Sequence, residues 1–210
     1  MSDAWAEPAP RKQRQLPDVL TDDEVDRLLA APNIRTHTGL RDRAIMEVAL
    51  RAGLRVSEIC DLRADAVDLD TGWLHVRHGK RDKSRDLAIG PRLAPWLQRW
   101  VEIRPESPYF FCSVWSGHAT GNPPGQRLSR QAIGETFRRY AGKAGVAPRE
   151  EGMHPARPHG FRHKFATEAV RAGVSVFVLQ KLMGHADSST TSLYLHMESR
   201  DVADAMAQIG

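Results

Sequence analysis

The stretch that most constrains the fold of this chain runs over residues 158–196 and reads PHGFRHKFATEAVRAGVSVFVLQKLMGHADSSTTSLYLH. Its apolar residues recur at helical spacing, which predicts helices near residues 161–171, 176–183 and 189–195. The Gly184-His185 pair predicts a turn between the second and third of these helices. Into this pattern the stretch places two imidazoles, a guanidinium and a phenol, namely His159, His185, Arg162 and Tyr194.

The rest of the chain predicts a mostly helical α+β domain with a small antiparallel sheet. Thr21 and Glu24 have the spacing of a helix-capping box. Helices are further expected over residues 40–53, directly after Arg55, from Pro91, from Ser129 to 141, and near 200–208. Residues 73–76 and 87–89 are expected to form the two strands of a hairpin, and residues 78–86 form its basic tip. Residues 109–114 are expected to form a third strand.

The distribution of charge indicates a face that binds phosphate. The net charge of the whole chain is +4, but residues 77–104 carry +5 and residues 127–164 carry +6. Two basic blocks on an otherwise acidic chain are typical of nucleic-acid binding, although an Arg-rich solvated surface would look the same.

The composition also bears on where the chain works. No apolar run approaches the roughly 20 residues that span a bilayer, and no secretory signal is visible, so no membrane partner is expected. The two cysteines, Cys60 and Cys112, sit in apolar surroundings and are expected to be buried free thiols of a cytoplasmic protein.

These residue types suit the attack of a phenol oxygen on a phosphodiester. Guanidinium groups hold two phosphate oxygens at once, so Arg55 and Arg162 would clamp the phosphate. Imidazoles add hydrogen bonds or exchange protons near neutral pH. Lys80, at the hairpin tip, would protonate the leaving oxygen. A tyrosyl ester at Tyr194 would conserve the bond energy for rejoining.

Each of these residues also has an ordinary explanation. Arg55 could pair with Glu58 at a helix end, the two imidazoles could cap helices, Tyr194 could be a core aromatic, and Arg162 and Lys80 could be solvated. His159 and His163 have the spacing of a zinc pair. However, the HExxH pattern requires glutamate where Gly160 stands, so no metal site is predicted.

The order of these motifs resembles the tyrosine recombinase (phage integrase) family, including its Xer-like and small fimbrial-switch members. GLRVSEI is similar to the first-arginine box, HGK to the catalytic-lysine turn, HGFRHKFAT to the His-x-x-Arg box, and LMGHADSSTTSLYLH to the box with the last histidine and the tyrosine. The resemblance implies a site-specific recombinase that forms a 3′-phosphotyrosyl intermediate and exchanges strands without metal or cofactor. The catalytic residues it implies are Arg55, Lys80, His159, Arg162, His185 and Tyr194.

The resemblance also implies how the chain meets its partners. Double-stranded DNA is the expected partner, with the helix from Ser129 to 141 in the major groove. The free chain is expected to be a monomer, to form a tetramer on paired sites through its C-terminal tail, and to work with accessory DNA-binding proteins. The expected DNA contacts are Arg81, Lys83, Arg127, Arg130, Gln131, Arg138 and Arg139.

The resemblance covers the chain from about residue 16 to the C-terminus. Residues 1–17 are therefore expected to be a flexible arm and residues 18–210 a catalytic domain, without the N-terminal core-binding domain that most members carry. Three other functions are left open: a type IB topoisomerase, a non-catalytic DNA-binding regulator on the same fold, and, with least support, a metal hydrolase.

Overall fold

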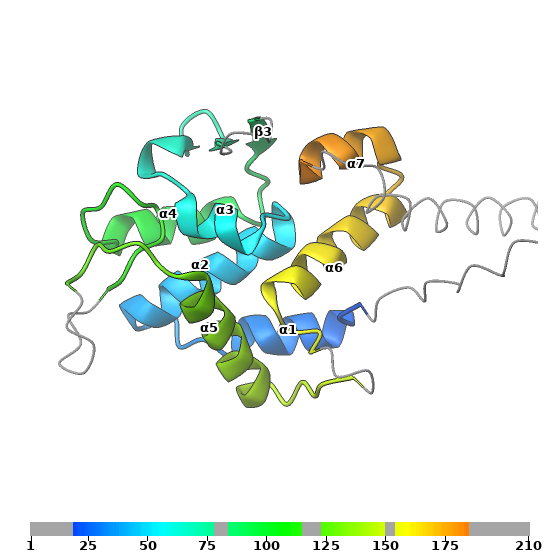
Figure 1. Ribbon diagram of the computed structural model, residues 1–210, viewed down its shortest axis with the longest axis horizontal. Helices are drawn as coiled ribbons and strands as arrows, with labels where there is room; N and C mark the ends of the chain where they lie inside the picture. Colours follow the sequence, from blue (N-terminus) through cyan, green and yellow to red (C-terminus); the bar gives the residue numbers. More distant parts are fainter. Residues whose placement is uncertain (1–18, 78–83, 115–122, 150–153, 185–210) are drawn as a thin grey trace, which may run out of the picture.

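The computed structural model describes residues 19–77, 84–114, 123–149 and 154–184, and within them the chain is a helical domain with one small sheet (Figure 1). The predicted α+β class is thus confirmed. Among these residues no helix is both long and apolar enough to cross a membrane.

The first three helices build the centre of the molecule. Helix α1 (Asp22–Ala30) begins at the predicted capping box, in which the Thr21 hydroxyl and the Glu24 carboxylate each accept a backbone N–H. Helix α2 (His37–Arg51) packs against both α4 and α6, and most of its length is buried. Helix α3 (Val56–Asp61) follows a bend at Arg55, as the sequence predicted.

The sheet is antiparallel and has the order β1-β2-β3. Strand β1 (Val67–Asp68) follows a short 3-10 turn, η1 (Ala64–Ala66), and pairs with β2 (Trp73–Val76). Strand β2 pairs with β3 (Arg85–Ala88), which confirms the predicted hairpin. Residues 109–114, in contrast, form only isolated bridges, to Arg63 and Arg127, so the predicted third strand there is wrong.

Two later helices close the main core. Helix α4 (Ala94–Ile103) buries Leu97 and Trp100, while Val101 is 43% exposed. Helix α5 (Arg130–Lys143) is capped by the Ser129 hydroxyl, as predicted, and turns Ile133, Phe137 and Tyr140 into the core.

The last described elements, α6 (Pro158–Arg171) and α7 (Val176–Met183), form a smaller apolar cluster of their own through Ala166, Val170, Leu179 and Met183. In Figure 1, α7 lies against the C-terminal end of α6, and it also contacts β3.

Three predicted helix starts need correction. Helix α6 begins at Pro158 rather than near residue 161, because proline suits the first turn of a helix. Helix α2 begins at His37 rather than at residue 40, because the Thr36 hydroxyl caps it by accepting the Gly39 N–H at 3.1 Å. Helix α4 begins at Ala94, after a turn that starts at Pro91.

Both cysteines are buried and in thiol form, as predicted, and burial raises the pKa of each.

Candidate active site

Three arginines from three separate segments meet at the C-terminal end of α7. Arg85 Nε donates to the carbonyl oxygen of Leu182 at 2.6 Å. Arg162 Nη2 donates to that of Met183 at 2.6 Å, and Arg55 Nη2 to that of Gly184 at 2.7 Å. The last carbonyls of a helix have no partner within it and carry a partial negative charge, so three guanidinium groups stabilise this end. We call Arg55, Arg85, Arg162 and the carboxylate of Glu58 the arginine cluster.

Glu58 holds two of these arginines together. Its side chain is nearly buried and accepts both terminal nitrogens of Arg85, at 3.0 and 2.8 Å. It also accepts the backbone N–H of Arg55 at 2.8 Å and the Arg55 guanidinium at 3.0 Å. Burial opposes ionisation of Glu58, but the hydrogen bonds and charge of Arg85, the Arg55 N–H and the charge of Arg162 outweigh it, and they lower the pKa.

Arg162 is almost fully buried and is anchored at a second point, the carbonyl of Gly53, which lies two residues before Arg55. The GLRVSEI and HGFRH motifs, far apart in the sequence, are therefore brought into direct contact. Buried guanidinium groups held by several backbone acceptors have a fixed orientation, which an electrostatic site requires.

His159 lies one helical turn before Arg162 on α6. Its Nε2 lies 2.7 Å from Nε2 of His163. A hydrogen bond between two ring nitrogens needs one N–H and one lone pair, so at least one ring is neutral. Packing around His159, followed by the charges of Arg162 and Arg157, lowers its pKa, and the ring remains partly open to solvent. Within the part of the chain that the structure describes, no three metal-ligating side chains cluster.

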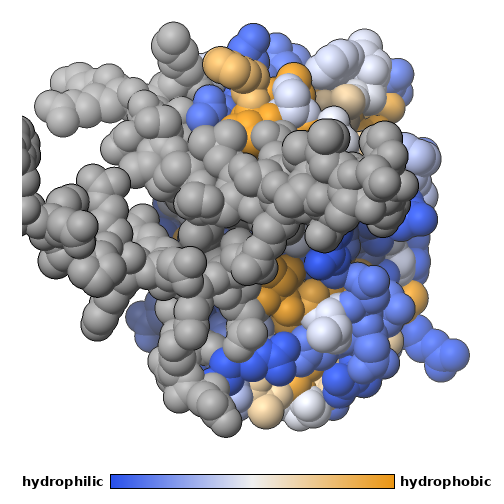
Figure 2. Space-filling model, turned by 90° about the vertical axis from the view of Figure 1, so that its right-hand side faces the viewer, coloured by the Kyte–Doolittle hydropathy of each residue, from blue (hydrophilic) through white to orange (hydrophobic). Residues whose placement is uncertain are grey.

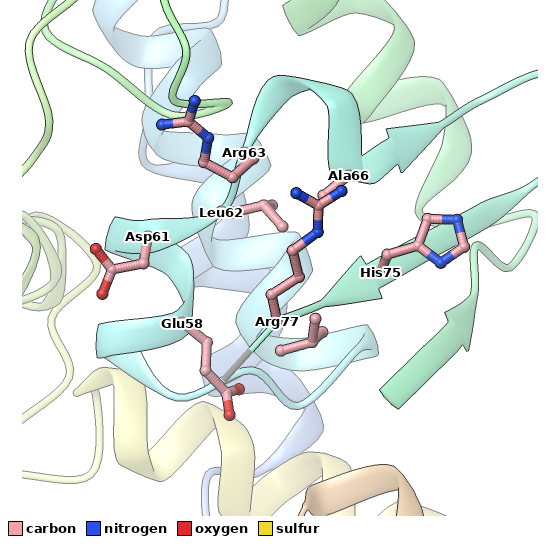
Figure 3. Close-up of a pocket in the computed structure, with 8 residues that line it drawn as sticks. Glu58, Asp61, Leu62, Arg63, Ala66, His75 and Arg77 are labelled. Atoms are coloured by element: carbon pink, nitrogen blue, oxygen red, sulfur yellow. The ribbon is translucent and has the colours of Figure 1, made fainter. Parts of the chain in front are cut away.

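A shallow pocket beside the sheet does not coincide with this site. It is lined by both charged and apolar side chains (Figure 3), namely Glu58, Asp61, Leu62, Arg63, Ala66, His75, Val76 and Arg77. Of the arginine cluster only Glu58 reaches it. Two of its other charged residues are paired, Asp61 with Arg127 at 2.6 Å and His75 with Asp86 at 2.7 Å.

The outer face of α5 is exposed, as predicted for Arg130, Gln131, Arg138 and Arg139. Their surroundings differ. Arg139 forms a 2.9 Å ion pair with Asp42, a fully buried carboxylate that also accepts the Tyr140 hydroxyl at 3.0 Å. Arg130 and Arg138 form no ion pair with another described residue. Arg139 thus joins α5 to α2, while Arg130 and Arg138 face solvent.

The sequence pattern of the phage integrase family matches residues 18–200. The chain belongs to the phage integrase family. It is 36% identical over 197 residues to the tyrosine recombinase XerD of Lacticaseibacillus casei, in an alignment that covers 91% of this chain and 62% of that relative.

Solved structures of family members agree. The crystal structure of XerA recombinase aligns with a TM-score of 0.72 at 28% identity, over 92% of this chain and 65% of that one. The XerH recombinase bound to its palindromic difH substrate aligns with a TM-score of 0.70 at 22% identity, over 92% of this chain and 53% of that one. The chain spans less than two thirds of the length of these relatives. The resemblance stated from the motifs is therefore confirmed as to family and fold.

The structure places some of the predicted site residues and not others. Arg55 and Arg162 meet at the end of α7, with His159 on the same helix as Arg162. Arg127 lies outside this cluster and pairs with Asp61. The predicted residues that lie outside the described part of the chain are Lys80, Arg81, Lys83, His185 and Tyr194.

The sequence reasoning missed Arg85. The sequence prediction placed Arg85 in the hairpin tip and began the strand at residue 87, whereas β3 begins at Arg85. Arg85 and the buried Leu87 are two residues apart and so share one face of β3, a spacing that could have given the signal. A charged residue on the inward face of a strand indicates a buried partner.

Proposed function

We propose that this chain is the catalytic domain of a site-specific DNA recombinase that cleaves and rejoins DNA through a phosphotyrosyl intermediate. The observation that carries the proposal is the meeting of Arg55 and Arg162 at the end of α7, where the Gly184-His185 motif begins. Membership of a family whose relatives are named tyrosine recombinases supports it. In this proposal residues 18–210 form the catalytic domain.

Each residue then has a defined role. Arg55 and Arg162 bind the non-bridging oxygens of the scissile phosphate and offset the charge that builds up in the transition state. Tyr194 Oη attacks phosphorus, forms the phosphotyrosyl ester and displaces the deoxyribose oxygen. Lys80 protonates that oxygen, and His159 and His185 donate to or exchange protons with the phosphate and the nucleophile. Rejoining is the reverse reaction.

The proposed partners follow from the same account. Double-stranded DNA contacts the basic residues near the hairpin tip and the exposed face of α5, including Arg130 and Arg138. A free monomer assembles into a tetramer on paired sites through residues 199–210, and accessory DNA-binding proteins take part in the assembly.

A nicked duplex tests the cleavage step. The probe is a pool of nicked duplexes with randomised flanks, enriched for binding to the chain. A short fragment beyond the cleavage point diffuses away, so rejoining fails and the protein stays attached. We expect a denaturant-resistant adduct in EDTA with the intact chain and none with Tyr194→Phe, which should still bind the pool.

The outcomes separate the alternatives. Bound DNA without any adduct would favour the non-catalytic regulator. An adduct accompanied by relaxation of supercoiled plasmids that lack the enriched sequence would favour a topoisomerase.

A further inference from the structure

Arg85 is the member of the arginine cluster that no motif of the sequence brought into the site. It lies at the first position of β3, and only 8% of its side chain is exposed. Its planar fork binds both oxygens of Glu58, while its Nε binds the Leu182 carbonyl. One side chain therefore joins the sheet, α3 and α7.

The contacts of Arg85 lead directly to Arg55. Glu58, which Arg85 grips at both oxygens, holds Arg55 through its backbone N–H and its guanidinium. Arg55 then donates to the Gly184 carbonyl, two residues beyond the carbonyl that Arg85 binds. Arg85 and Arg55 thus share a carboxylate at one end and the last turn of α7 at the other.

The end of α7 is held by both polar contacts and apolar packing. Leu179 and Met183 belong to a small cluster with α6, and Leu182 packs against the main core. The three arginines bind the carbonyls of this same turn. Gly184, which ends the helix in a left-handed conformation (φ 60°), lies against Arg85, and a Cβ at this position would be 2.7 Å from Arg85 Nη1. Glycine at position 184 therefore allows both the left-handed backbone and the close approach of the Arg85 guanidinium.

We propose that Arg85 is a positioning residue for the cleavage reaction: it orients Arg55 through Glu58 and fixes the end of α7, from which the chain continues to His185. The proposal rests on the proposed function. Lysine would keep the charge but has no planar fork, so it cannot bind both oxygens of Glu58 and the Leu182 carbonyl in one plane.

Single-turnover cleavage of the nicked duplex tests this role. Arg85→Lys should bind DNA as the intact chain does and cleave about tenfold to a hundredfold more slowly, because misplacing a reacting group costs rate rather than affinity. The matched control is Arg27→Lys. Arg27 also joins a carboxylate, Asp23, to carbonyls at a helix end, those of Ala144 and Gly145, but it lies away from the cluster. The Arg27→Lys variant should cleave the nicked duplex at the rate of the intact chain.

A second substrate shows whether Arg85 acts through Arg55 or through Lys80, the proposed acid for the leaving group. When the bridging 5′ oxygen is replaced by sulfur, the leaving group departs without a proton. On this substrate the cleavage rate of Lys80→Ala should return to that of the intact chain, whereas the rate of Arg85→Lys should stay low. Recovery of Arg85→Lys would mean that Arg85 acts through the lysine of the hairpin, and an unchanged rate on the normal substrate would mean that it positions nothing; either result overturns the proposal.

Amide hydrogen exchange tests whether Arg85 fixes the end of α7, and this measurement does not require that the protein cleave DNA. In Arg85→Lys, and in Arg85→Met as a second variant, the amides of the last turn of α7 should exchange about tenfold faster, while those at the end of α5 should not change. Unchanged exchange at α7 overturns the proposal even if the intact chain cleaves no DNA. A failure of the proposed function alone would appear as no adduct with faster exchange at α7.

Discussion

Gly160 stands in the first turn of α6, between the proposed catalytic residues, and its surroundings explain why this position has no side chain. A Cβ there would lie 1.8 Å from the carbonyl oxygen of Pro155. The same glycine set the HGFRH motif apart from a zinc-binding HExxH motif. Its absence of a side chain lets the segment before α6 pass close to the helix.

Substitution of two glycines should therefore have opposite effects. Gly160→Ala should lower the free energy of unfolding by about 1–3 kcal/mol, because the backbone must move to admit the methyl group. Gly134→Ala, in α5 with open space around it, should raise it by up to about 1 kcal/mol, because alanine favours the helix. Urea unfolding measures both. Equal effects of the two variants would contradict the contact with Pro155.

His159 should titrate below its ordinary pKa of 6.5 in the folded chain. The unfolded chain then takes up this proton first as the pH falls. The contribution of His159 to stability is therefore complete above about pH 6.5 and is lost as the pH falls through the lowered pKa. NMR titration of the ring protons measures this pKa, and Arg157→Gln should raise it part of the way towards 6.5. Titration at or above 6.5 would show that packing and the neighbouring charges do not act as described.

Among the secondary-structure elements, α5 carries two adjacent arginines with different surroundings. Arg138 is exposed and forms no ion pair with another described residue, whereas Arg139 lies over the Tyr140 ring and pairs with the buried Asp42. Both were expected to contact DNA from the sequence alone. In the structure, Arg138 is a surface charge, whereas Arg139 joins α5 to α2 through Asp42.

The two arginines should therefore respond differently to replacement by glutamine. Arg138→Gln should leave the free energy of unfolding within about 0.5 kcal/mol and reduce the slope of log affinity against log salt by about 0.9. Arg139→Gln should cost about 1 kcal/mol of stability, since it removes a charged hydrogen bond to a buried carboxylate. Thermal unfolding and DNA binding at several salt concentrations measure both. A loss of stability in Arg138→Gln as large as that in Arg139→Gln would contradict the assignment.

The elements themselves were predictable where a local signal decides them. The Thr21 capping box and the start of α5 after Ser129 follow from residues that contact one another within a few positions. The hairpin follows from two alternating segments joined by a polar, glycine-containing turn. The prediction of a strand at residues 109–114 was wrong because an apolar run becomes a strand only where a neighbouring strand pairs with it. Here only isolated bridges form, and Val67–Asp68 takes the third place in the sheet.

Seen as a whole, the molecule gathers its polar site from segments that the sequence keeps far apart. The motifs identified Arg55 and Arg162, and the spacing of three residues indicated the Arg55–Glu58 pair, which the structure contains. Nothing local indicates that both arginines bind carbonyls of α7 or that Arg85 binds Glu58. Such contacts depend on tertiary packing.

The side of the molecule that carries α6 and α7 faces the viewer in Figure 2, where apolar surface lies among hydrophilic residues. Phe177 and Val178 of α7 are exposed, at 81% and 48%.

Arg55 and Arg162 have fixed guanidinium groups. Backbone carbonyls orient both groups, and Glu58 also orients that of Arg55. In the proposed mechanism, this fixed orientation is what allows the two groups to hold a phosphate. The central claim of the proposed mechanism is that Tyr194 is the nucleophile.

Mass spectrometry of the trapped protein–DNA adduct tests this account most directly. The adduct formed on the nicked duplex in EDTA is digested with protease and nuclease, and the peptide that carries the remaining nucleotide is sequenced. We predict that the nucleotide is attached to Tyr194 and that Tyr194→Phe yields no modified peptide. Attachment to any other residue, or an adduct of equal yield from Tyr194→Phe, would contradict the proposed mechanism.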